Sequence, residues 1–480
     1  MTASTRAAGA GAFVREVIRK LQPALLIAAH ELNILWLRLD AWIGRFGQAS
    51  GQARVLASAC WSFPIYSQTF VHQEVLALAR AGFAVRFLYA NLAPRSELAQ
   101  ACAPLWRLKR RIILHACTGA RDLVRFRRER PELVDALIRD LAQATGLRPE
   151  VIETNEHFLH AFSFARAVRA WRTDYLHSYF FYEQTLFAWV ASRLLGIPRG
   201  ISCYADHMLD DYPLKAVGLH LKECDVVVAT SRRIAAELEG IHGAPLSGLV
   251  VKPNAIDTAG FLPRVRRQRN RDEPLRLICV CRIDPKKGIE YLMAAVRLLL
   301  DQGLAIEARI IGAADGQSPQ ALSYAHTLRE LADKLGTDSA VIFAGQRGNH
   351  EIRRELAEAD VFVAPFVDLP SGDKDGIPTA LLEAMAGGCA IVATNAGSIA
   401  EVIDDGVHGI LVSQRDAAAL AEALQRLAAN EHLCQRLGSQ ALDRARREYN
   451  VATSEIGFHQ QVRCTVRRHR EQRDKVGAKT

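Results

Sequence analysis

From residue 54 onward, short apolar runs alternate along the chain with longer segments in which apolar residues recur every three or four positions. This alternation is typical of a parallel sheet covered by helices. In the first half, the runs expected to form strands are Val55–Cys60, Phe83–Ala90, Ile112–His115, Val151–Thr154, Tyr175–Ser178, Gly200–Cys203, Asp225–Ala229 and Leu249–Val251. In the second half they are Leu275–Cys281, Ala308–Ile311, Val341–Phe343, Val361–Ala364, Ala390–Ala393 and Gly409–Val412. The sequence therefore predicts two α/β domains.

A charged segment of low hydropathy separates the two series, and we expect it to be a linker. The predicted organisation is an amphipathic extension at 1–53, an α/β domain at 54–263, the linker at 264–273, a second α/β domain at 274–448, and a C-terminal helix with a basic tail at 449–480. In open α/β sheets, ligands bind at the carboxyl ends of the strands. We therefore expect a ligand cleft between the two domains.

The N-terminal extension is amphipathic from residue 13 to residue 21 and then apolar from Leu25 to Leu39. The second run contains His30, Glu31 and Asn33, and it is too short and too polar for a membrane span. Two interpretations remain open for this extension: a helix lying in a membrane interface, or a helix packed on the protein body.

Composition narrows the class of protein. Hydrophobic residues make up 49% and charged residues 24% of the chain, which is typical of a globular protein rather than a disordered one. The ten cysteines include no Cys-x-x-Cys pair. Reduced thiols and a cytoplasmic location are the simplest expectation.

The net charge of +9 favours anionic partners, and the excess is local. Nine cations fall within residues 107–130, opposed only by Asp122 and Glu129. Such a stretch is typical of a solvated helix face, a nucleic-acid-binding surface or a surface that binds anionic lipid. Because the aromatic interleaving typical of base stacking is absent and no nucleic-acid motif accompanies the stretch, we expect no nucleic-acid partner. An anionic membrane surface is kept as a candidate partner.

The most informative motif is Asp375-Gly-Ile-Pro-Thr-Ala-Leu-Leu-Glu383, which places two carboxylates eight positions apart across a turn that opens a helix. Proline suits the first position of a helix, and free backbone N–H groups there bind phosphate. The predicted contributors to a diphosphate site are Gly376, Ile377, Thr379 and Ala380. Glu383 is placed to accept hydrogen bonds from a ribose, and Asp375 from hydroxyls of a sugar.

A second motif, Cys281-Arg282-Ile-Asp-Pro-Lys-Lys287-Gly, joins a strand end to a helix start with cations on either side of a turn. Arg282 and Lys287 are placed to hold a diphosphate and to stabilise its charge as it departs. A solvated turn with ordinary surface cations is the alternative.

Weaker signals follow two other strands. Gly312 and Gly397 each stand just after a strand, as phosphate-cradling glycines often do, although plain strand-to-helix turns have the same composition. Asp373-Lys-Asp375 has the spacing of a metal motif, but the lysine lies between the carboxylates and the paired cations already supply charge stabilisation. We therefore expect no metal and no cofactor.

Taken together, these motifs resemble the retaining glycosyltransferases of family 4 over about residues 54–449. The resemblance implies the GT-B fold, an α/β architecture of two facing Rossmann-like domains with a ligand cleft between them. It implies donor-diphosphate binding by Arg282 and Lys287, and places Glu383 at the ribose and Asp375 at the donor sugar. The aspartate is one methylene shorter than the family's usual glutamate.

The first domain resembles a branch of the family that builds bacterial exopolysaccharide and lipopolysaccharide. Phe-Pro-Ile-Tyr-Ser67-Gln-Thr69-Phe resembles that branch's first loop, which implies that Ser67 and Thr69 face the cleft on the acceptor or sugar side. Pro-Asn-Ala-Ile-Asp257 resembles a segment ahead of the hinge of that branch. Where family members usually have Thr-Ala-His-x-x-Asp, this chain has Ser-Cys-Tyr204-Ala-Asp206-His207.

Tyr204 thus takes the position of a histidine near the reacting face. Asp206 and His207 are candidates to compensate for it on the acceptor or sugar side. His177 matches a further histidine of the family, although a packed structural histidine is the alternative for this residue.

The resemblance implies transfer of a sugar from a UDP- or GDP-sugar to a glycan or lipid-linked acceptor, with retention and with the leaving phosphate taking the proton. The expected location is cytoplasmic, on the inner face of the cytoplasmic membrane if the anionic-surface interpretation holds. Two alternatives are kept: a non-catalytic partner of a polysaccharide assembly complex, and a sugar-nucleotide epimerase on the same fold. The donor, acceptor and linkage are left open.

Overall fold

A computed structural model describes residues 3–44, 52–63, 69–92, 103–209, 212–261, 273–316 and 318–477. The contacts divide these residues into two compact units. The first unit comprises residues 1–228, 238–250 and 457–480, and the second comprises residues 229–237 and 251–456. Most of the predicted linker at 264–273 lies outside the described residues.

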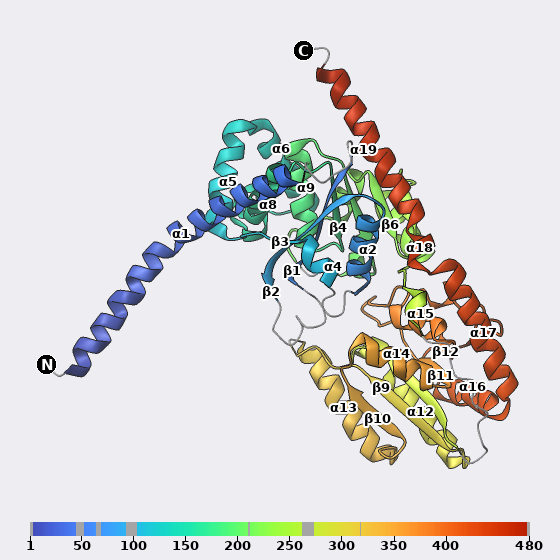
Figure 1. The fold of residues 1–480 in the computed structure, drawn as a ribbon. Helices are drawn as coiled ribbons and strands as arrows, with labels where there is room; N and C mark the ends of the chain where they lie inside the picture. Colours follow the sequence, from blue (N-terminus) through green and yellow to red (C-terminus); the bar gives the residue numbers. More distant parts are fainter. Residues whose placement is uncertain are drawn as a thin grey trace. The chain divides into compact units, whose positions relative to one another are not determined.

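The first unit is built on a seven-stranded sheet in the order β3-β2-β1-β4-β5-β6-β7 (Figure 1). Its strands are β1 Arg54–Phe63, β2 Ala84–Leu92, β3 Lys109–Arg111, β4 Tyr175–Tyr179, β5 Arg199–Cys203, β6 Val226–Ala229 and β7 Leu249–Val251. The pairs from β3 to β5 are parallel. Neighbouring residues of β1 face opposite cores, since Val55 and Leu56 belong to different hydrophobic clusters.

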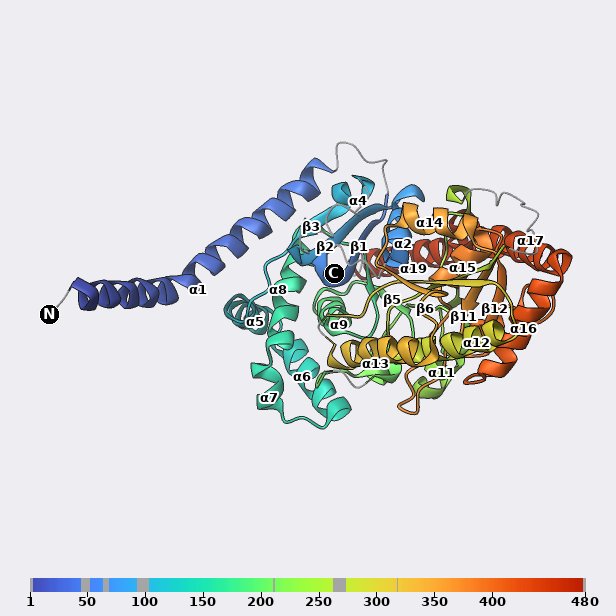
Figure 2. The same ribbon diagram turned by 90° about the horizontal axis from the view of Figure 1, so that it is seen from below.

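Helices cover both faces of this sheet. They are α1 Ala3–Ile43, α2 Thr69–Arg80, α4 Ala103–Leu108, α5 Ala116–Glu129, α6 Pro131–Thr145, α7 Pro149–Thr154, α8 Glu156–Trp171, α9 Glu183–Leu195, α10 Val217–Lys222 and α11 Arg232–His242, which continues from the second unit. Residues of α1, α5, α6, α8 and α9 share one core with β1, β2 and β4, and residues of α2 and α4 share the other (Figure 2).

The C-terminal helix α19 Ile456–Gly477 packs on the first unit. Phe458, Val462 and Val466 are buried in the same core as α2 and α4. Two polar contacts add to this packing: His469 Nε2 lies 3.0 Å from a carboxylate oxygen of Asp225, and Arg470 forms an ion pair with Asp174 at 2.8 Å.

The second unit has a six-stranded sheet in the order β10-β9-β8-β11-β12-β13, and all five neighbouring pairs are parallel. Its strands are β8 Leu275–Val280, β9 Ile306–Ile311, β10 Val341–Gly345, β11 Val361–Ala364, β12 Ala390–Thr394 and β13 Ile410–Val412. Its helices are α12 Ile289–Asp301, α13 Pro319–Leu335, α14 Asn349–Glu358, α15 Thr379–Ala386, α16 Ala417–Ala429, α17 Glu431–Glu448 and α18 Val451–Ser454. The two Rossmann-like sheets confirm the predicted α/β class.

Two predicted strands are wrong. Val151–Thr154 is part of α7, because Pro149 occupies the first helical turn and Glu150 is favourable at the positive end of the helix dipole. Ile112–His115 follows a strand instead of forming one: the strand is Lys109–Arg111, and His115 caps α5 by accepting from the backbone N–H of Cys117. Asn430 separates α16 from α17, and its side chain caps α17 by accepting from the backbone N–H of Leu433.

Within the described ranges, none of the helices combines the length and the apolar character needed to cross a membrane. The eight cysteines from Cys117 to Cys464 are all free thiols.

Candidate functional site

The loop after β8 carries the predicted diphosphate-binding cations. Residues Pro285–Lys287 form one 3₁₀ turn, and the Asp284 side chain caps it by accepting from the backbone N–H of Lys286 at 3.1 Å. Gly288 has a φ of +55°, and a Cβ there would lie 2.2 Å from the carbonyl oxygen of Pro365. This glycine is required because the loop passes directly over another backbone segment.

Lys287 and Asp375 form a close ion pair, so the two strongest sequence motifs meet in the structure. The Lys287 ammonium also lies 4.2 Å from the centroid of the Phe366 ring, which is within the range of a cation–π contact. The neighbouring Lys286 binds Asp373 at 2.9 Å and lies 3.9 Å from Asp375. Both carboxylates of the Asp-x-Asp sequence are therefore held by lysines.

Asp375 is charged despite its burial. Burial alone would raise the pKa of its carboxyl group, but Lys287, Lys286 and Arg282 together hold the pKa below its ordinary value. Arg282 itself is exposed just beyond the end of β8. The guanidinium of Arg282 has no hydrogen bond or ion pair to the described part of the chain, so its donors are available to a ligand.

The backbone of Asp375 is held on two sides. The guanidinium of Arg233 donates to the Asp375 carbonyl oxygen at 3.0 Å. Gly397 has a φ of +56°, and a Cβ there would lie 2.1 Å from that same oxygen. Gly397 thus lets the loop after β12 pack directly against Asp375, and its predicted contact with the donor stays a prediction.

Helix α15 begins at Thr379, and Pro378 is its N-cap residue rather than its first helical residue. The backbone N–H groups of Thr379 and Ala380 have no acceptor in the described part of the chain. The buried side chain of Asn254 donates to the hydroxyl of Thr379 at 3.2 Å. This end of the helix can therefore receive an anion, as its sequence predicts.

Glu383 lies one turn further along α15. Burial raises the pKa of its carboxyl group to about 7, and the positive charge of Arg353 opposes the rise only in part. No hydrogen bond to its carboxyl group is formed within the described ranges. A carboxyl group with this pKa exists in both protonation states near neutral pH, so it can either donate to or accept from a ligand hydroxyl.

Of three glycine or apolar positions in the predicted site, Ile377 and Gly312 have structural explanations and Gly376 has none. A Cβ at Gly376 would meet its nearest neighbour at 3.5 Å, so close backbone approach does not explain this glycine. Ile377 is buried in the core of the second unit. A Cβ at Gly312 would overlap the carbonyl oxygen of Cys281 at 1.8 Å, which accounts for a glycine there without a ligand. A role for these three residues in donor binding stays a prediction.

After Gly397, residues Ile399–Glu401 form a single 3₁₀ turn. The Glu401 carboxylate accepts from the backbone N–H groups of Arg232 at 2.6 Å and Arg233 at 2.9 Å. Glu401 thus caps the start of α11, which is a structural role.

His177 is fully buried in the first unit. Its ring nitrogens lie 3.2 Å from the hydroxyl of Tyr175 and 2.9 Å from that of Ser202, and Glu74 lies 3.3 Å away. The ring also packs 4.9 Å from Phe458 of α19. These contacts support the structural alternative stated for this histidine.

Tyr204 and His207 also belong to the first unit. The Tyr204 ring packs between Phe70 at 4.7 Å and Phe180 at 4.5 Å. His207 is buried, and its Nδ1 lies 3.2 Å from the carbonyl oxygen of Tyr204 in a local turn. Ser67 lies outside the described residues, and so do the side chains of Thr69 and Asp206. Their acceptor-side roles stay predictions.

Several residues around Asp375 and Glu383 were not singled out from the sequence. Lys286 could have been predicted from the sequence, since it stands beside Lys287 in the same turn. Arg233 and Arg353 could not, because they come from α11 and α14, which no local motif connects to the 375–383 segment.

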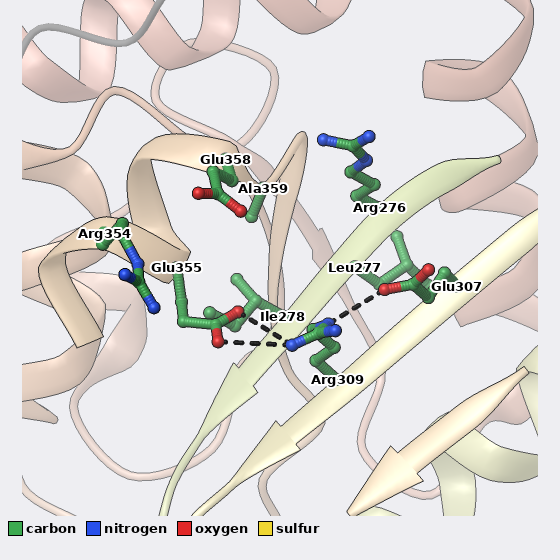
Figure 3. Close-up of a pocket in the computed structure, with 9 residues that line it drawn as sticks. All are labelled: Arg276, Leu277, Ile278, Glu307, Arg309, Arg354, Glu355, Glu358 and Ala359. Carbon is green, nitrogen blue, oxygen red and sulfur yellow. Dashed lines mark hydrogen bonds and ion pairs between the residues drawn. The ribbon is translucent and has the colours of Figure 1, made fainter. Parts of the chain in front are cut away.

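A separate pocket of the second unit lies away from these residues, between α14 and strands β8 and β9 (Figure 3). Its centre is occupied by an ion-pair cluster in which Arg309 contacts Glu307 at 2.9 Å and Glu355 at 3.2 Å. None of the predicted site residues lines this pocket.

Several known proteins are similar to this chain in sequence or in fold. Residues 274–430 match the family described as "Glycosyl transferases group 1". A protein named for colanic acid biosynthesis, the glycosyltransferase WcaL of Escherichia coli K12, is 28% identical over 408 residues, which cover 83% of this chain and 95% of WcaL. The amylovoran biosynthesis glycosyltransferase AmsK of Erwinia amylovora is 35% identical over 189 residues, covering 39% of this chain and 44% of AmsK.

Solved structures are similar in fold. A sucrose-phosphate synthase from Thermosynechococcus elongatus superposes with a TM-score of 0.64 at 18% identity, covering 86% of this chain and 98% of that one. HepE of Anabaena, solved with UDP-glucose, superposes with a TM-score of 0.59 at 16% identity, covering 86% and 99%. Both are structural neighbours of the GT-B class, and the two relatives in sequence are named for the biosynthesis of exopolysaccharides. Residues 274–430 are thus similar in sequence to the group 1 glycosyltransferases, and the chain shares the α/β GT-B fold of its structural neighbours.

Proposed function

We propose that the second unit binds the diphosphate of a nucleotide sugar between the loop after β8 and the start of α15. The observation that carries the proposal is the Lys287–Asp375 ion pair, which joins these two segments. Arg282 offers unpaired donors beside it, and Thr379 and Ala380 offer free backbone N–H groups. Two cations and a helix start together supply the charge and donors that a diphosphate requires.

The carboxylates then recognise the sugars on either side of the diphosphate. Asp375, which stays ionised, accepts hydrogen bonds from hydroxyls of the transferred sugar. Glu383, one turn into α15, forms hydrogen bonds with the ribose hydroxyls. Because its carboxyl group is present in both protonation states near neutral pH, it can donate to one of these hydroxyls or accept from it.

Transfer proceeds with retention and without a metal ion. The acceptor oxygen forms its bond to the anomeric carbon on the face from which the diphosphate departs, and the acceptor proton passes to a phosphate oxygen of the leaving group. Arg282 and Lys287 stabilise the charge that develops on that group, as preorganised cations do in a partly buried site. The chain then needs no pair of closely spaced carboxyl groups like that of a retaining hydrolase.

The donor is a UDP- or GDP-sugar, and the acceptor is a glycan or a lipid-linked glycan made at the cytoplasmic face of the membrane. The donor class is supported by HepE, which was solved with UDP-glucose. The acceptor class is supported by relatives named for colanic acid and amylovoran biosynthesis.

The test is nucleotide release by the purified protein from a panel of UDP-, GDP- and ADP-sugars, with and without membrane extract, followed by determination of the anomeric configuration of the product. Release from one donor that depends on the extract and is abolished in Glu383→Ala supports the proposal. Binding of a donor without release in a competent extract favours a non-catalytic partner, and conversion of the donor without acceptor favours an epimerase. Inversion at the anomeric carbon would contradict the retaining mechanism.

A further inference from the structure

Over residues 22–44, helix α1 is apolar on two sides, and only one of these sides packs on the rest of the first unit. Ile34, Leu37 and Ala41 are buried in its core. The other side bears large apolar side chains that are exposed, namely Leu25, Leu32, Leu35, Trp36, Leu39, Trp42 and Ile43. Leu32 is 67% exposed and Trp42 56% exposed. These residues recur at intervals of three, four and seven, so they form one continuous strip along the helix, here called the outer strip.

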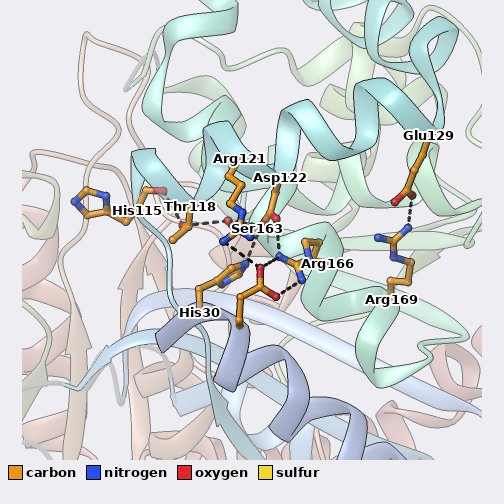
Figure 4. Close-up of polar contacts among 10 residues, drawn as sticks. His30, His115, Thr118, Arg121, Asp122, Glu129, Ser163, Arg166 and Arg169 are labelled. Atoms are coloured by element: carbon orange, nitrogen blue, oxygen red, sulfur yellow. Dashed lines mark hydrogen bonds and ion pairs between the residues drawn. The ribbon is translucent and has the colours of Figure 1, made fainter. Parts of the chain in front are cut away.

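A buried polar cluster fixes the orientation of the outer strip (Figure 4). His30 of α1 lies 2.8 Å from Asp122 of α5, and Arg166 of α8 donates to Asp122 at 2.7 Å. The same guanidinium donates to Glu31 of α1 at 2.8 Å. Since His30, Asp122 and Arg166 are almost fully buried, this cluster locks one side of α1 against α5 and α8. The outer strip is thereby held facing away from the core.

Arginines of α5 border one edge of the outer strip. Arg121 lies 3.6 Å from Glu31, the residue that precedes Leu32 of the strip. Arg125 and Arg128 follow Arg121 at helical intervals of four and three, so all three arginines share one face of α5. Together with Val124 and Glu129, they line a surface pocket.

Arginines of β3 and β2 border the other edge. Arg110 donates to Asp40 of α1 at 2.6 Å, and Arg86 donates to the same carboxylate at 2.7 Å. Asn33 donates to the backbone carbonyl of Arg111 at 2.9 Å. Basic residues therefore lie on both sides of an apolar strip that carries two tryptophans.

We propose that the outer strip and its bordering arginines form a surface for docking on an anionic lipid bilayer, with α1 lying in the plane of the interface. An apolar helical face with tryptophan suits the boundary between headgroups and acyl chains, and the arginines are attracted to anionic headgroups. The two carboxylates of residues 22–44, Glu31 and Asp40, are neutralised by arginines. Pairing of the strip with a second copy of the chain would bring like charges together, which charge complementarity disfavours.

Docking on a bilayer would hold the enzyme where a lipid-linked acceptor is found. This consequence of the docking surface rests on the proposed function. The docking itself involves no sugar and no nucleotide. Its test is therefore independent of turnover, and a failure of either proposal can be told from a failure of the other.

The experiment is flotation of the full-length protein with vesicles of phosphatidylcholine and phosphatidylglycerol in equal parts, and with vesicles of phosphatidylcholine alone. The apolar variant is Trp36→Asp/Leu39→Asp, and its matched control is Leu298→Asp/Leu322→Asp, which changes two exposed leucines of α12 and α13. The charge variant is Arg125→Glu/Arg128→Glu, and its control is Arg467→Glu/Arg473→Glu on α19, which changes the net charge equally. Circular dichroism and thermal unfolding establish that each variant is folded.

We expect the wild-type protein and both controls to float with anionic vesicles. The apolar variant should lose on the order of tenfold or more in bound protein, and the charge variant about fivefold per arginine. The proposal is overturned if either variant binds as its control does, or if vesicles of phosphatidylcholine alone bind the wild type equally well. It is also overturned if the wild type binds no vesicles and the apolar variant converts a dimer to a monomer, since the strip would then contact a second copy.

Discussion

The ammonium group of Lys287 donates to the carboxylate of Asp375 and lies 4.2 Å from the centroid of the Phe366 ring. Residues 88 positions apart in the sequence are thus brought into one site by the order of the strands. Because β8 and β11 are neighbours in the sheet, the loops at their carboxyl ends lie side by side. The same pair fixes a cation and an anion in the positions that the proposed reaction uses.

Replacing Lys287 by alanine should destabilise the protein as well as reduce sugar transfer. The side chains of Lys287 and Asp375 are only 10% and 15% exposed, so the substitution leaves a largely buried carboxylate without its nearest cation. Because Lys286 remains 3.9 Å away, we expect a loss at the lower end of about 3–5 kcal/mol in the free energy of unfolding. Urea denaturation measures it. Lys334→Ala, on an exposed position of α13, is the control, and an equal loss in both variants would show that the ion pair is unimportant.

Glu383 should make stability depend on pH. Burial raises the pKa of its carboxyl group from 4.5 to about 7. In the unfolded chain the group ionises from its ordinary pKa upward, while the folded chain holds the proton up to about pH 7. The contribution of this group is therefore fully present below its unfolded pKa and is lost as the pH rises through about 7.

Glu383→Gln lacks this titration. As the pH rises from about 4 to about 8, wild type should lose up to about 3 kcal/mol in the free energy of unfolding relative to the variant. Denaturation curves of both proteins at a series of pH values test this. Parallel profiles for the two proteins would mean that the carboxyl group ionises normally in the folded state.

Two glycines of the same site should respond differently to alanine. Gly397→Ala places a Cβ 2.1 Å from the Asp375 carbonyl oxygen at a φ of +56°, so it should cost roughly 1–3 kcal/mol in stability and displace Asp375. Gly376→Ala has 3.5 Å of space and should fold with nearly unchanged stability. Thermal unfolding and nucleotide release measure both effects. Equal tolerance of the two substitutions would contradict the close packing described for Asp375.

Asp122 should be essential for the attachment of α1. Its removal in Asp122→Ala leaves Arg166 and His30 buried without this partner, and we expect a loss of about 3–5 kcal/mol in the free energy of unfolding. Glu129→Ala, which breaks the exposed pair with Arg169 seen in Figure 4, should change it by no more than about 1 kcal/mol. Limited proteolysis near residue 44 reports the release of α1. If the two variants are equally stable, the cluster does not hold the helix.

Much of the fold could be predicted because parallel strands buried on both faces are continuous apolar runs. Tyr175–Tyr179 and Ala390–Thr394 are fully buried, and both were predicted within one residue. Val151–Thr154 was misjudged because a run with β-branched residues also fits a short helix, and the deciding signal was the preceding Pro149.

The site could be predicted in part for a similar reason. Lys287, Asp375 and Glu383 lie in local motifs whose residue types carry the chemistry. Arg233 and Arg353 could not be found, since their approach depends on how α11 and α14 pack, which no spacing in the sequence encodes. The role of a glycine could not be predicted from its residue type alone. Gly312 lies at a close backbone contact, whereas a side chain at Gly376 would have space.

The most direct test of the account is equilibrium binding of UDP, GDP and ADP by calorimetry to the wild-type protein, to Arg282→Ala and to Arg329→Ala. Arg282 is the exposed cation beyond β8, and Arg329 is an exposed arginine of α13 away from the proposed site. We predict that one nucleoside diphosphate binds wild type and Arg329→Ala alike, and that Arg282→Ala weakens it by about 10- to 100-fold through the loss of charge-assisted hydrogen bonds. Equal affinity in all three proteins would contradict the placement of the diphosphate at this loop.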